Sequence, residues 1–344
     1  MAATIRDVAR AAGVSAATVS LVVTGGADRL RIAQATRQRV LAAAEALGYV
    51  ADPRVRALRR GGTRTILAAF VARGVPDAFF ADILHALDAE ATRRGRDVQF
   101  RLIRPGSGDG DGGGGDGGDD GWDTLRSASK AAAGVVLVGS LPPGAAGGAR
   151  PRRPLPVPAV QIGSGDGLPG VSVVRVDNRH AGRAIAEHLL ALGHRTTAVL
   201  GPSTWYAPFV ERREGYLEVF RGVGAPEPLV VSESHPNGAT VARLRAAGVS
   251  AVVCLYDRLA LALLRQARRA GVPIPEEWSL AGFDDMDWSA MLAPSLTTVH
   301  IPRARMAAAA VERLEALIAG GAPGEPPAIV PELVERESTV RRGE

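Results

Sequence analysis

The chain has 344 residues, of which 46% are hydrophobic and 22% are charged. This length exceeds a single core and predicts two or three domains of roughly 100–200 residues, while the composition excludes a largely disordered or fibrous chain. No stretch combines the features of a secretory signal, and none reaches the ~18 apolar residues of a membrane span, so we expect a cytoplasmic protein.

Positive charge is concentrated at the N-terminal end. The whole chain has a formal net charge of +5, but residues 1–64 alone carry eleven arginines against four acidic residues. The rest of the chain is therefore slightly acidic. A small basic segment on a near-neutral body is typical of a protein that binds nucleic acid through that segment.

The first fifty residues predict three short helices. Thr4 and Asp7 have the spacing of a capping box, which predicts a helix start, and Gly13 permits a sharp turn after it. Ser15 is a suitable cap for a second helix that runs to about Val23. A third helix is expected over residues 34–47. The apolar faces of the three helices are expected to contain Val8, Val14, Val19, Val22, Val40, Leu41, Ala44 and Leu47. Three helices in this length predict a helix-turn-helix unit, whose second helix enters the major groove.

From residue 65 onward, apolar runs of strand length alternate with amphipathic helices. The expected strands are Ile66–Val71, Val98–Ile103, Gly134–Val138, Pro158–Ile162, Val171–Val176, Thr197–Leu200, Leu229–Val231, Ala251–Leu255 and Ser279–Phe283. The expected helices are Ala81–Arg94, His180–Leu192, Val210–Arg221, Ala239–Ala247 and Arg258–Ala270. This alternation predicts two parallel sheets covered on both faces, with binding chemistry at the carboxyl ends of the strands.

Other features of the chain argue against catalysis. The six histidines show no metal-ligand spacing, and the phosphate-loop and nucleophile-turn motifs are both absent. Cys254 lies in an apolar run and is expected to be a buried thiol. Residues 106–121 contain ten glycines and five aspartates without the nine-residue register of a calcium repeat, which predicts a disordered loop. We therefore expect no enzyme, no cofactor and no metal.

Several motifs along the chain resemble those of one family. They are Thr4–Ser15, Thr18–Ser20, Thr36–Val40, Leu47–Tyr49, Val174–Asn178, Leu192–Arg195, Arg212–Tyr216, Gly271–Pro275, Gly282–Asp285, Pro294–Thr298 and Glu332–Ser338. In this order they resemble the lactose-repressor (LacI/GalR) family of bacterial transcription regulators. The resemblance implies an N-terminal all-α helix-turn-helix domain and an α/β core of two doubly wound parallel-sheet lobes, similar to periplasmic binding proteins.

The resemblance also implies a domain plan and partners. Residues 1–50 would form the DNA-binding domain, 51–62 a hinge helix or linker, and 63–344 the core for effector binding and dimerisation. The core would divide into lobe one, residues 63–162 and 292–324, and lobe two, residues 163–291 and 325–344. The expected partners are a palindromic double-stranded operator, a small effector such as a sugar or its derivative, and a second copy of the chain, with a tetramer as the alternative.

The expected DNA contacts differ from the usual family pattern. The family often has arginine where this chain has Leu21, and larger side chains at Ala16 and Ala17. Alanine and leucine can pack on thymine methyl groups, and threonine and serine hydroxyls can reach phosphates; the alternative is that Leu21 belongs to the core. Leu58 matches the leucine that wedges into the minor groove, although a basic tether is the alternative for this segment. The full expected set is Thr4, Ser15, Ala16, Ala17, Thr18, Ser20, Leu21, Thr24, Tyr49, Arg56 and Leu58.

The resemblance places an effector site in the core. Arg212 and Asp284 match the effector-binding arginine and aspartate of the family, and a guanidinium and a carboxylate can together hold sugar hydroxyls. Tyr256 replaces the usual asparagine, and Asp257 is expected to be a ligand or a helix cap. The full expected set is Phe79, Trp205, Arg212, Tyr256, Asp257, Asp284 and Trp288. Two alternatives stay open: a regulator whose core binds no small molecule, and a cytoplasmic sugar-binding or sugar-acting α/β protein.

Overall fold

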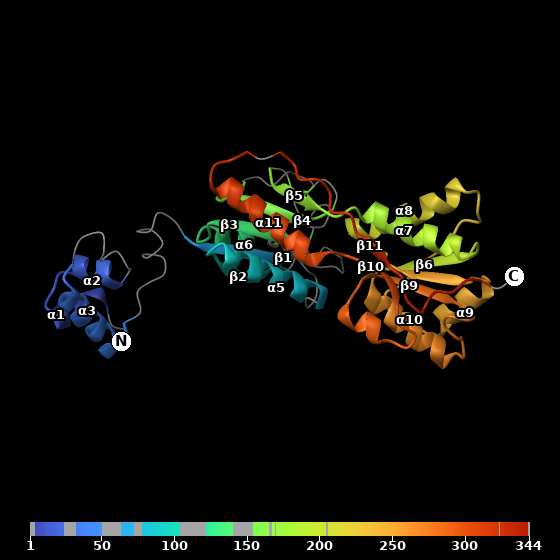
Figure 1. The fold of residues 1–344 in the computed structure, drawn as a ribbon, viewed down its shortest axis with the longest axis horizontal. Coiled ribbons are helices and arrows are strands. Elements are labelled where there is room, and N and C mark those ends of the chain that lie inside the picture. The colour runs from blue at the N-terminus through green and yellow to red at the C-terminus, as the bar shows by residue number, and fades with distance from the viewer. Residues whose placement is uncertain are drawn as a thin grey trace, which may run out of the picture. The chain divides into compact units, whose positions relative to one another are not determined.

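The computed structural model describes residues 4–23, 32–49, 63–71, 78–103, 122–139, 154–164, 167–168, 170–203, 206–322 and 324–342. They form two compact units, one with the N-terminal helices and one with the α/β core (Figure 1). The expected hinge and the Gly/Asp-rich segment lie outside the described residues. So do four expected site residues: Thr24, Arg56, Leu58 and Trp205. Within the described part of the chain, every helix is too short or too polar to cross a membrane.

The N-terminal unit has the three expected helices, α1 (Ile5–Ala12), α2 (Ala16–Val23) and α3 (Gln34–Ala46). The Asp7 carboxylate accepts hydrogen bonds from the Thr4 amide at 2.9 Å and the Thr4 hydroxyl at 2.6 Å, and these bonds lower the pKa of Asp7. Gly13 has a φ of 65°, as the turn requires. The Thr18 amide donates to Ser15 Oγ at 3.1 Å, so Ser15 caps α2.

The core of this unit is smaller than the sequence predicted. Its buried residues are Val8, Ala9, Ala12, Val19, Val22, Val40 and Ala44. Leu41 and Leu47 were expected there, but they are 52% and 41% exposed. Leu41 lies about 100° around α3 from Val40, and Leu47 follows the last residue of the helix. Only one narrow stripe of α3 therefore faces the other two helices.

Two sheets form the α/β core. The first has the strand order β2-β1-β3-β4-β5 and the second β11-β10-β9-β8-β6-β7. The first sheet contains β1 (Thr65–Val71), β2 (Asp97–Ile103), β3 (Gly134–Val138), β4 (Ala159–Gly163) and β5 (Ser172–Arg175). The second contains β6 (Thr197–Gly201), β7 (Leu229–Ser232), β8 (Ala251–Cys254), β9 (Ser279–Asp284), β10 (Thr297–His300) and β11 (Glu332–Val334). Strand β11 pairs antiparallel with β10, whereas β6, β7, β8, β9 and β10 pair in parallel.

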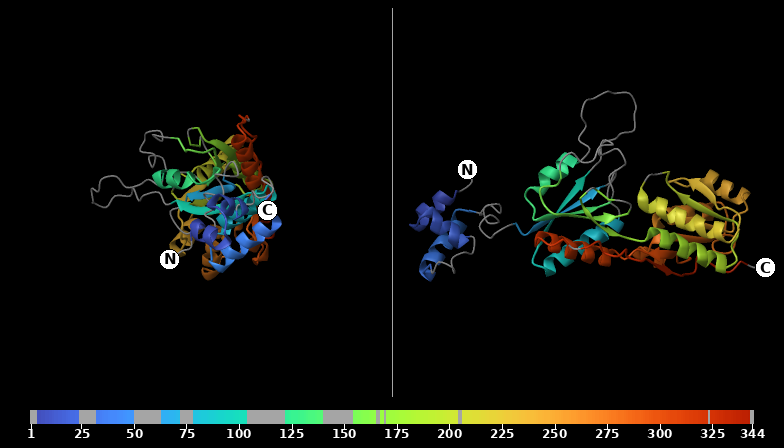
Figure 2. Two further views of the ribbon diagram at one scale, coloured as in Figure 1. Left: turned by 90° about the vertical axis from the view of Figure 1, so that its left-hand side faces the viewer. Right: turned by 90° about the horizontal axis from the view of Figure 1, so that it is seen from above.

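Helices cover both faces of each sheet (Figure 2). On the first sheet, α5 (Ala78–Arg93) packs beside α11 (Arg303–Ile318), and α6 (Trp122–Ser129) lies on the other face. The second sheet is covered by α7 (Asn178–Ala191) and α8 (Ala207–Gly222) on one side, and by α9 (Gly238–Ala246) and α10 (Asp257–Arg269) on the other. Val199 packs with the α7 and α8 side chains, whereas its neighbour Leu200 packs with those of α9 and α10. The core is doubly wound, as expected.

The lobe boundaries that follow from the two sheets differ from the expected ones. Strand β5 pairs with β4 in the first sheet, although residues after 162 were expected in the second lobe. Strand β10 pairs with β9 in the second sheet, although residues after 291 were expected in the first. The boundaries therefore fall near Val176 and Ile301, because the pairing of a strand with its neighbours, and not the loop before it, decides its lobe.

The C-terminal part of the chain completes both lobes. The buried face of α11 covers the first sheet through Met306, Ala310 and Leu314. In the second lobe, the Leu280 amide donates to the Ser338 carbonyl at 2.7 Å, and the Thr297 amide donates to Ser338 Oγ at 2.8 Å. Both lobes of the core are thus completed by residues after position 302.

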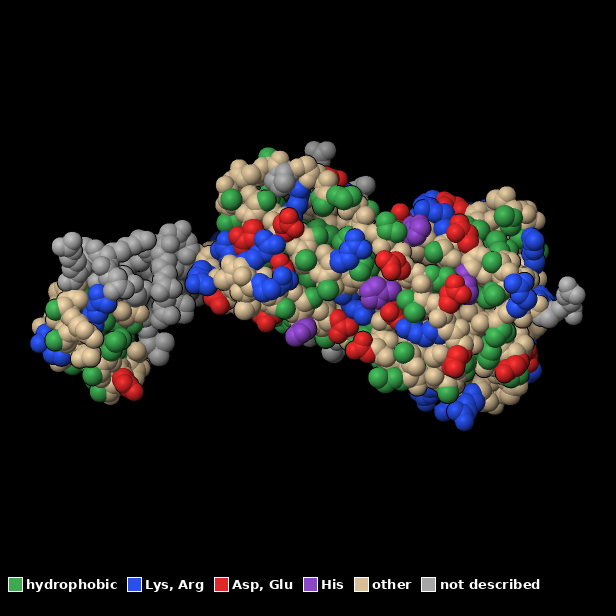
Figure 3. Space-filling model, viewed as in Figure 1, with side chains coloured by type: hydrophobic (Ala, Val, Ile, Leu, Met, Phe, Trp, Pro, Cys, Tyr) green, Lys and Arg blue, Asp and Glu red, His purple; other side chains and the backbone are tan. Residues whose placement is uncertain are grey.

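Figure 3 shows basic and acidic side chains interspersed over the visible face of the core. This mixture agrees with the nearly neutral charge of the chain after residue 64. On that face the core presents no large area of one sign, so the view gives no reason to place a nucleic-acid contact there.

Candidate functional site

A cavity of about 250 Å³ lies in the core at the carboxyl ends of strands from both sheets. Gly139 follows β3, Ser164 follows β4 and Asp284 ends β9, and all three line the cavity. The position is the one where parallel sheets place binding chemistry. The volume is just below the roughly 300–1,000 Å³ of small-molecule sites. The cavity therefore suits a ligand of modest size.

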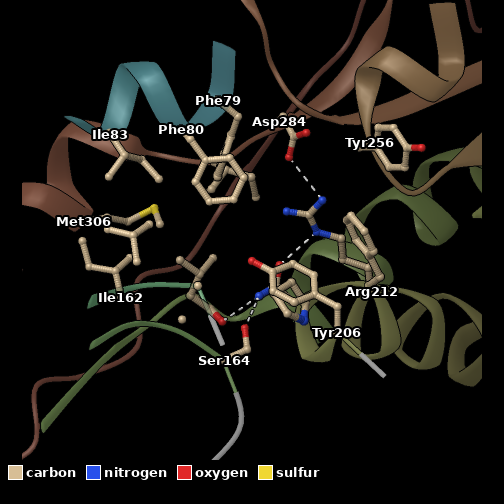
Figure 4. Close-up of a pocket in the computed structure, with 18 of the residues that line it drawn as sticks. Phe79, Phe80, Ile83, Ile162, Ser164, Tyr206, Arg212, Tyr256, Asp284 and Met306 are labelled. Atoms are coloured by element: carbon tan, nitrogen blue, oxygen red, sulfur yellow. Dashed lines mark hydrogen bonds and ion pairs between the residues drawn. The ribbon is translucent and has the colours of Figure 1, made fainter. Parts of the chain in front are cut away.

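Arg212 is the central polar side chain of the cavity (Figure 4). It is only 4% exposed, and its Nε donates to Asn178 Oδ1 at 2.9 Å. Its Nη1 donates to the Leu255 carbonyl at 2.8 Å and to Asp284 Oδ1 at 3.2 Å. Its guanidinium also lies over the Phe283 ring, with its central carbon 4.9 Å from the ring centroid. These contacts fix the guanidinium in one orientation before any ligand enters.

A close crossing of α7 and α8 brings Arg212 to Asn178. A Cβ atom on Gly182 would lie 2.0 Å from the Arg212 carbonyl oxygen, and one on Gly215 would lie 2.1 Å from the Arg179 carbonyl oxygen. Only glycine fits at both positions, since the obstacle is backbone in each case. The two glycines therefore set the separation of the helices that carry the polar side chains.

Asp284 lies in a loop of unusual backbone conformation. Asp284 has a φ of 112° and Asp285 a φ of 52°, both in the region that non-glycine residues rarely adopt. Asp285 accepts a hydrogen bond from Arg336 Nη2 at 2.6 Å and lies 3.0 Å from His300 Nδ1. These contacts hold the loop so that Asp284 faces the cavity.

Asp257 holds the same loop in place through buried hydrogen bonds. It is fully buried, and its carboxylate accepts hydrogen bonds from the Met286 amide at 3.1 Å, Ser289 Oγ at 2.7 Å and Thr298 Oγ1 at 2.7 Å. Burial raises the pKa of Asp257 to about 6, although the three hydrogen bonds act in the opposite direction. Asp257 does not line the cavity, so the expectation of a direct ligand contact is corrected to a supporting role.

Arg303 joins the loop to the first lobe. Its guanidinium donates to the carbonyl oxygens of Asp284 and, at 3.1 Å, of Asp285. Its Nε lies 3.2 Å from Asp82 Oδ2 on α5, and its guanidinium lies over the Phe79 ring at 5.7 Å. The loop that carries Asp284 is thus linked to the helix that forms the opposite wall of the cavity.

Only some of the expected effector residues line the cavity. Phe79, Arg212, Tyr256 and Asp284 line the cavity together. Trp288, also in the expected effector set, lies in the short helix η1 (Asp287–Met291) and is not among the residues that line the cavity. Sequence reasoning missed most of the lining residues, among them Phe80, Ser164, Asn178, Phe209 and Met306. Asn178 stands in a motif that carried the family resemblance, but no local signal marked the apolar ones.

Helix α2 presents a small apolar surface. Ala16 and Ala17 are exposed, and Leu21 is half-buried but does not belong to the core cluster or to the side chains packed on it. Ser20 is only 4% exposed, so its side chain is buried in the helical unit, and the expected phosphate contact stays a prediction. Thr18 Oγ1 lies 2.9 Å from Ser15 Oγ, Thr4 is exposed, and Tyr49 packs on the core cluster.

The chain joins a helix-turn-helix unit to a two-sheet core, an architecture that suits a DNA-binding transcription regulator. Two family models match the chain: "Bacterial regulatory proteins, lacI family" over residues 4–52, and "Periplasmic binding protein-like domain" over residues 186–339. The HTH-type transcriptional regulator MalR of Streptomyces coelicolor is 30% identical, with 98% of this chain and 97% of that protein covered. The chain belongs to the lacI family of bacterial transcription regulators.

Solved structures agree with this assignment. The lac repressor dimer bound to operator and the anti-inducer ONPF has a TM-score of 0.78 and 23% identity, covering 99% of this chain and 100% of that one, and shows the shared fold. The complex of the transcriptional regulator CelR with cellobiose has a TM-score of 0.63 and 27% identity, covering 98% and 99%. The relatives are regulators and not enzymes, and so is this chain.

Proposed function

We propose that this protein is an effector-responsive repressor that binds a palindromic operator as a dimer. The observation that supports this most is the cavity in which Arg212 and Asp284 meet, on a chain that also has a helix-turn-helix unit. A ligand in this cavity can change DNA affinity only if it favours one lobe arrangement over the other. The effector would act by shifting the two lobes, in the cytoplasm where the operator lies.

Small polyhydroxylated molecules are the effectors that the polar groups of the cavity favour. A guanidinium and a carboxylate fixed 3.2 Å apart can donate to and accept from neighbouring hydroxyls of one ring. The CelR relative was solved with the sugar cellobiose. The alternative of a core without a small ligand is weaker, because the cavity of about 250 Å³ presents the oriented polar groups of Arg212 and Asp284 where parallel sheets place binding chemistry.

The proposed DNA contact is a recognition helix that reads thymine methyl groups. Ala16, Ala17 and Leu21 lie on the part of α2 that the core cluster leaves uncovered. Arginines in residues 1–64, including the exposed Arg6 and Arg10, would contact phosphates. We assign residues 1–50 to DNA binding, 51–62 to the hinge and the remainder to the core, with the lobe boundaries at the crossings near Val176 and Ile301.

Asp284→Asn is expected to remove the effector response and to leave operator binding unchanged. The substitution keeps the shape of the side chain but removes the charge that pairs with Arg212 and accepts from a hydroxyl. Hydrogen bonds to charged groups contribute about 1.5–3 kcal/mol, so effector affinity should fall by roughly 10- to 100-fold. Calorimetry with a panel of sugars and nucleosides, followed by operator release measured by fluorescence anisotropy, tests this.

Asp287→Asn is the matched control for this experiment. Asp287 lies three residues away, is exposed and does not line the cavity, so the same change in charge should leave the response intact. If Asp284→Asn responds to every effector as the parent protein does, the effector is bound elsewhere.

Leu21→Ala is expected to remove a preference for thymine at one operator position. In the parent protein, replacing that thymine with uracil removes the methyl group and should weaken binding by about 1 kcal/mol, the lower end of the range for a specific base contact. In Leu21→Ala the two DNAs should bind equally. Leu41→Ala is the control, since Leu41 is exposed on α3. A thymine preference that persists in Leu21→Ala would show that another side chain reads this base.

A further inference from the structure

The cavity has a polar end and an apolar end (Figure 4). Arg212, Asp284 and Asn178 form the polar end, where Asn178 Nδ2 also donates to Ser164 Oγ at 2.7 Å. Figure 4 shows Phe79, Phe80, Ile83, Ile162 and Met306 grouped on the other side. Ile83, Ile162 and Met306 are at most 5% exposed. The two ends have different chemistry, so one ligand that fills the cavity must have two different parts.

A bare sugar matches only one of these ends. Its hydroxyls can bond with Arg212 and Asp284, but those placed against the apolar side chains of Phe79, Phe80 and Met306 would lose water to no benefit. The polar end also carries little net charge, because the Asp284 carboxylate lies 3.2 Å from the Arg212 guanidinium. Arg258 lines the cavity as well, but its side chain is exposed, so water and salt screen its charge. The polar end is therefore suited to hydroxyls more than to an anionic group.

Aromatic side chains line the cavity in contacting pairs. Phe209 and Tyr256 are stacked with ring centroids 5.5 Å apart and an interplanar angle of 23°. Phe79 and Phe80 meet edge to face at 5.8 Å and 88°. All four rings line the cavity. Aromatic side chains in these orientations offer both faces and edges to another ring, which an aromatic ligand can use in either geometry.

We propose that the effector is a sugar that carries an aromatic ring, with its hydroxyls on Arg212 and Asp284 and its ring against Phe79, Phe80 and Met306. This inference rests on the proposed function of the cavity as the effector site. Aryl glycosides and nucleosides share this chemistry, since both join a polyol to a flat ring. The apolar wall selects the ring, and the paired charges select the sugar.

The test compares pairs of ligands on the full-length protein by calorimetry. Phenyl β-D-glucoside is compared with methyl β-D-glucoside, and uridine and adenosine are compared with D-ribose. In at least one pair the member with the ring should bind about tenfold more tightly, because it buries apolar surface that the other lacks. The pair that shows the gain distinguishes a glycoside from a nucleoside.

Phe79→Leu separates the aromatic contact from a general change in the cavity. The substitution keeps apolar bulk but removes the flat ring, so it should cut the preference for the aromatic ligand over its bare partner severalfold. Phe100→Leu is the control, because Phe100 lies on β2, is 48% exposed and does not line the cavity. Circular dichroism of both variants checks that the fold is kept.

The outcomes separate this inference from the proposed function. If bare sugars bind and release the operator as well as their aromatic partners do, the inference fails and the proposed function stands. If Phe79→Leu keeps the full aromatic preference, the ring does not bind where we place it, and the inference also fails. If no ligand of any pair binds at millimolar concentration, the proposed sugar site and this inference fail together.

Discussion

Gly182→Ala and Gly215→Ala are each expected to lower the free energy of unfolding of the core by about 3 kcal/mol or more, the upper range for overpacking in a core. A Cβ atom on either residue would lie about 2 Å from a backbone oxygen of the facing helix. No rotation of a side chain can relieve this contact. The helices α7 and α8 must separate, and Arg212 must then move away from Asn178.

Urea unfolding followed by circular dichroism measures this loss, and Gly222→Ala is its control. Gly222 is exposed near the end of α8, and a Cβ atom there would meet nothing within 4 Å. This variant should be as stable as the parent or more stable by about 0.5–1 kcal/mol, since alanine favours a helix. A Gly182→Ala protein with the unfolding midpoint of the parent would contradict the close crossing of the helices.

Asp257→Ala is expected to destabilise the core by about 3 kcal/mol and to weaken effector binding at the same time. The substitution leaves three donors without their acceptor: the Met286 amide and the hydroxyls of Ser289 and Thr298. A buried donor without a partner costs about 1–3 kcal/mol. The loop beyond Asp284 would relax, because its backbone conformation is held by these bonds. Urea unfolding and calorimetry measure the two effects.

Asp257→Asn tests the charge separately from the shape. Burial raises the pKa of Asp257 to about 6 in the folded protein, whereas an unfolded aspartate has a pKa near 3.9. The folded state therefore holds the proton more tightly, and the stability from this group is greatest below about pH 4 and is lost as the pH rises through about 6. Two units of pKa correspond to about 3 kcal/mol.

The parent protein should thus lose more stability than Asp257→Asn between about pH 4.5 and pH 7.5. The asparagine does not titrate, so its contribution stays constant across this range. Urea unfolding at both pH values measures the difference, and other titrating groups cancel because they are the same in both proteins. Parallel losses in the two proteins would mean that Asp257 is ionised at both pH values.

Local signals carried most of the prediction of the fold. The capping residues Thr4 and Ser15 and the turn at Gly13 are short-range features, and the structure confirms each of them. The alternation of strands and helices is also local, and the five expected helices of the core match observed ones to within a few residues, whereas α6, β10 and β11 were not expected. Helix α11 was not predicted either, although its buried residues have helical spacing. The helix contains many alanines, and their small side chains give its apolar face a weak hydrophobic signal in the sequence.

Long-range relations could not be predicted from local patterns. Which sheet contains β5 or β10 depends on strands that are distant in sequence, so two of the three expected lobe boundaries, after residues 162 and 291, do not match the sheets. Asp257 is adjacent to a residue that lines the cavity, yet its carboxylate points to three donors 29 to 41 residues away. Trp288 was a reasonable candidate for its type alone. The resemblance supplied Arg212 and Asp284, but the apolar wall of the cavity is visible only in three dimensions.

The late position of α11, β11 and Ser338 in the sequence has a consequence for synthesis on the ribosome. Translation adds about 5–20 residues per second and releases the N-terminal part of a chain first. The first sheet lacks the cover of α11 until residues 303–318 have emerged, and the second lacks Ser338 for even longer. During that interval the nascent chain exposes apolar strand faces in both lobes, the kind of surface on which chaperones act. Each lobe therefore gains its full cover only after residues 303–338 have emerged.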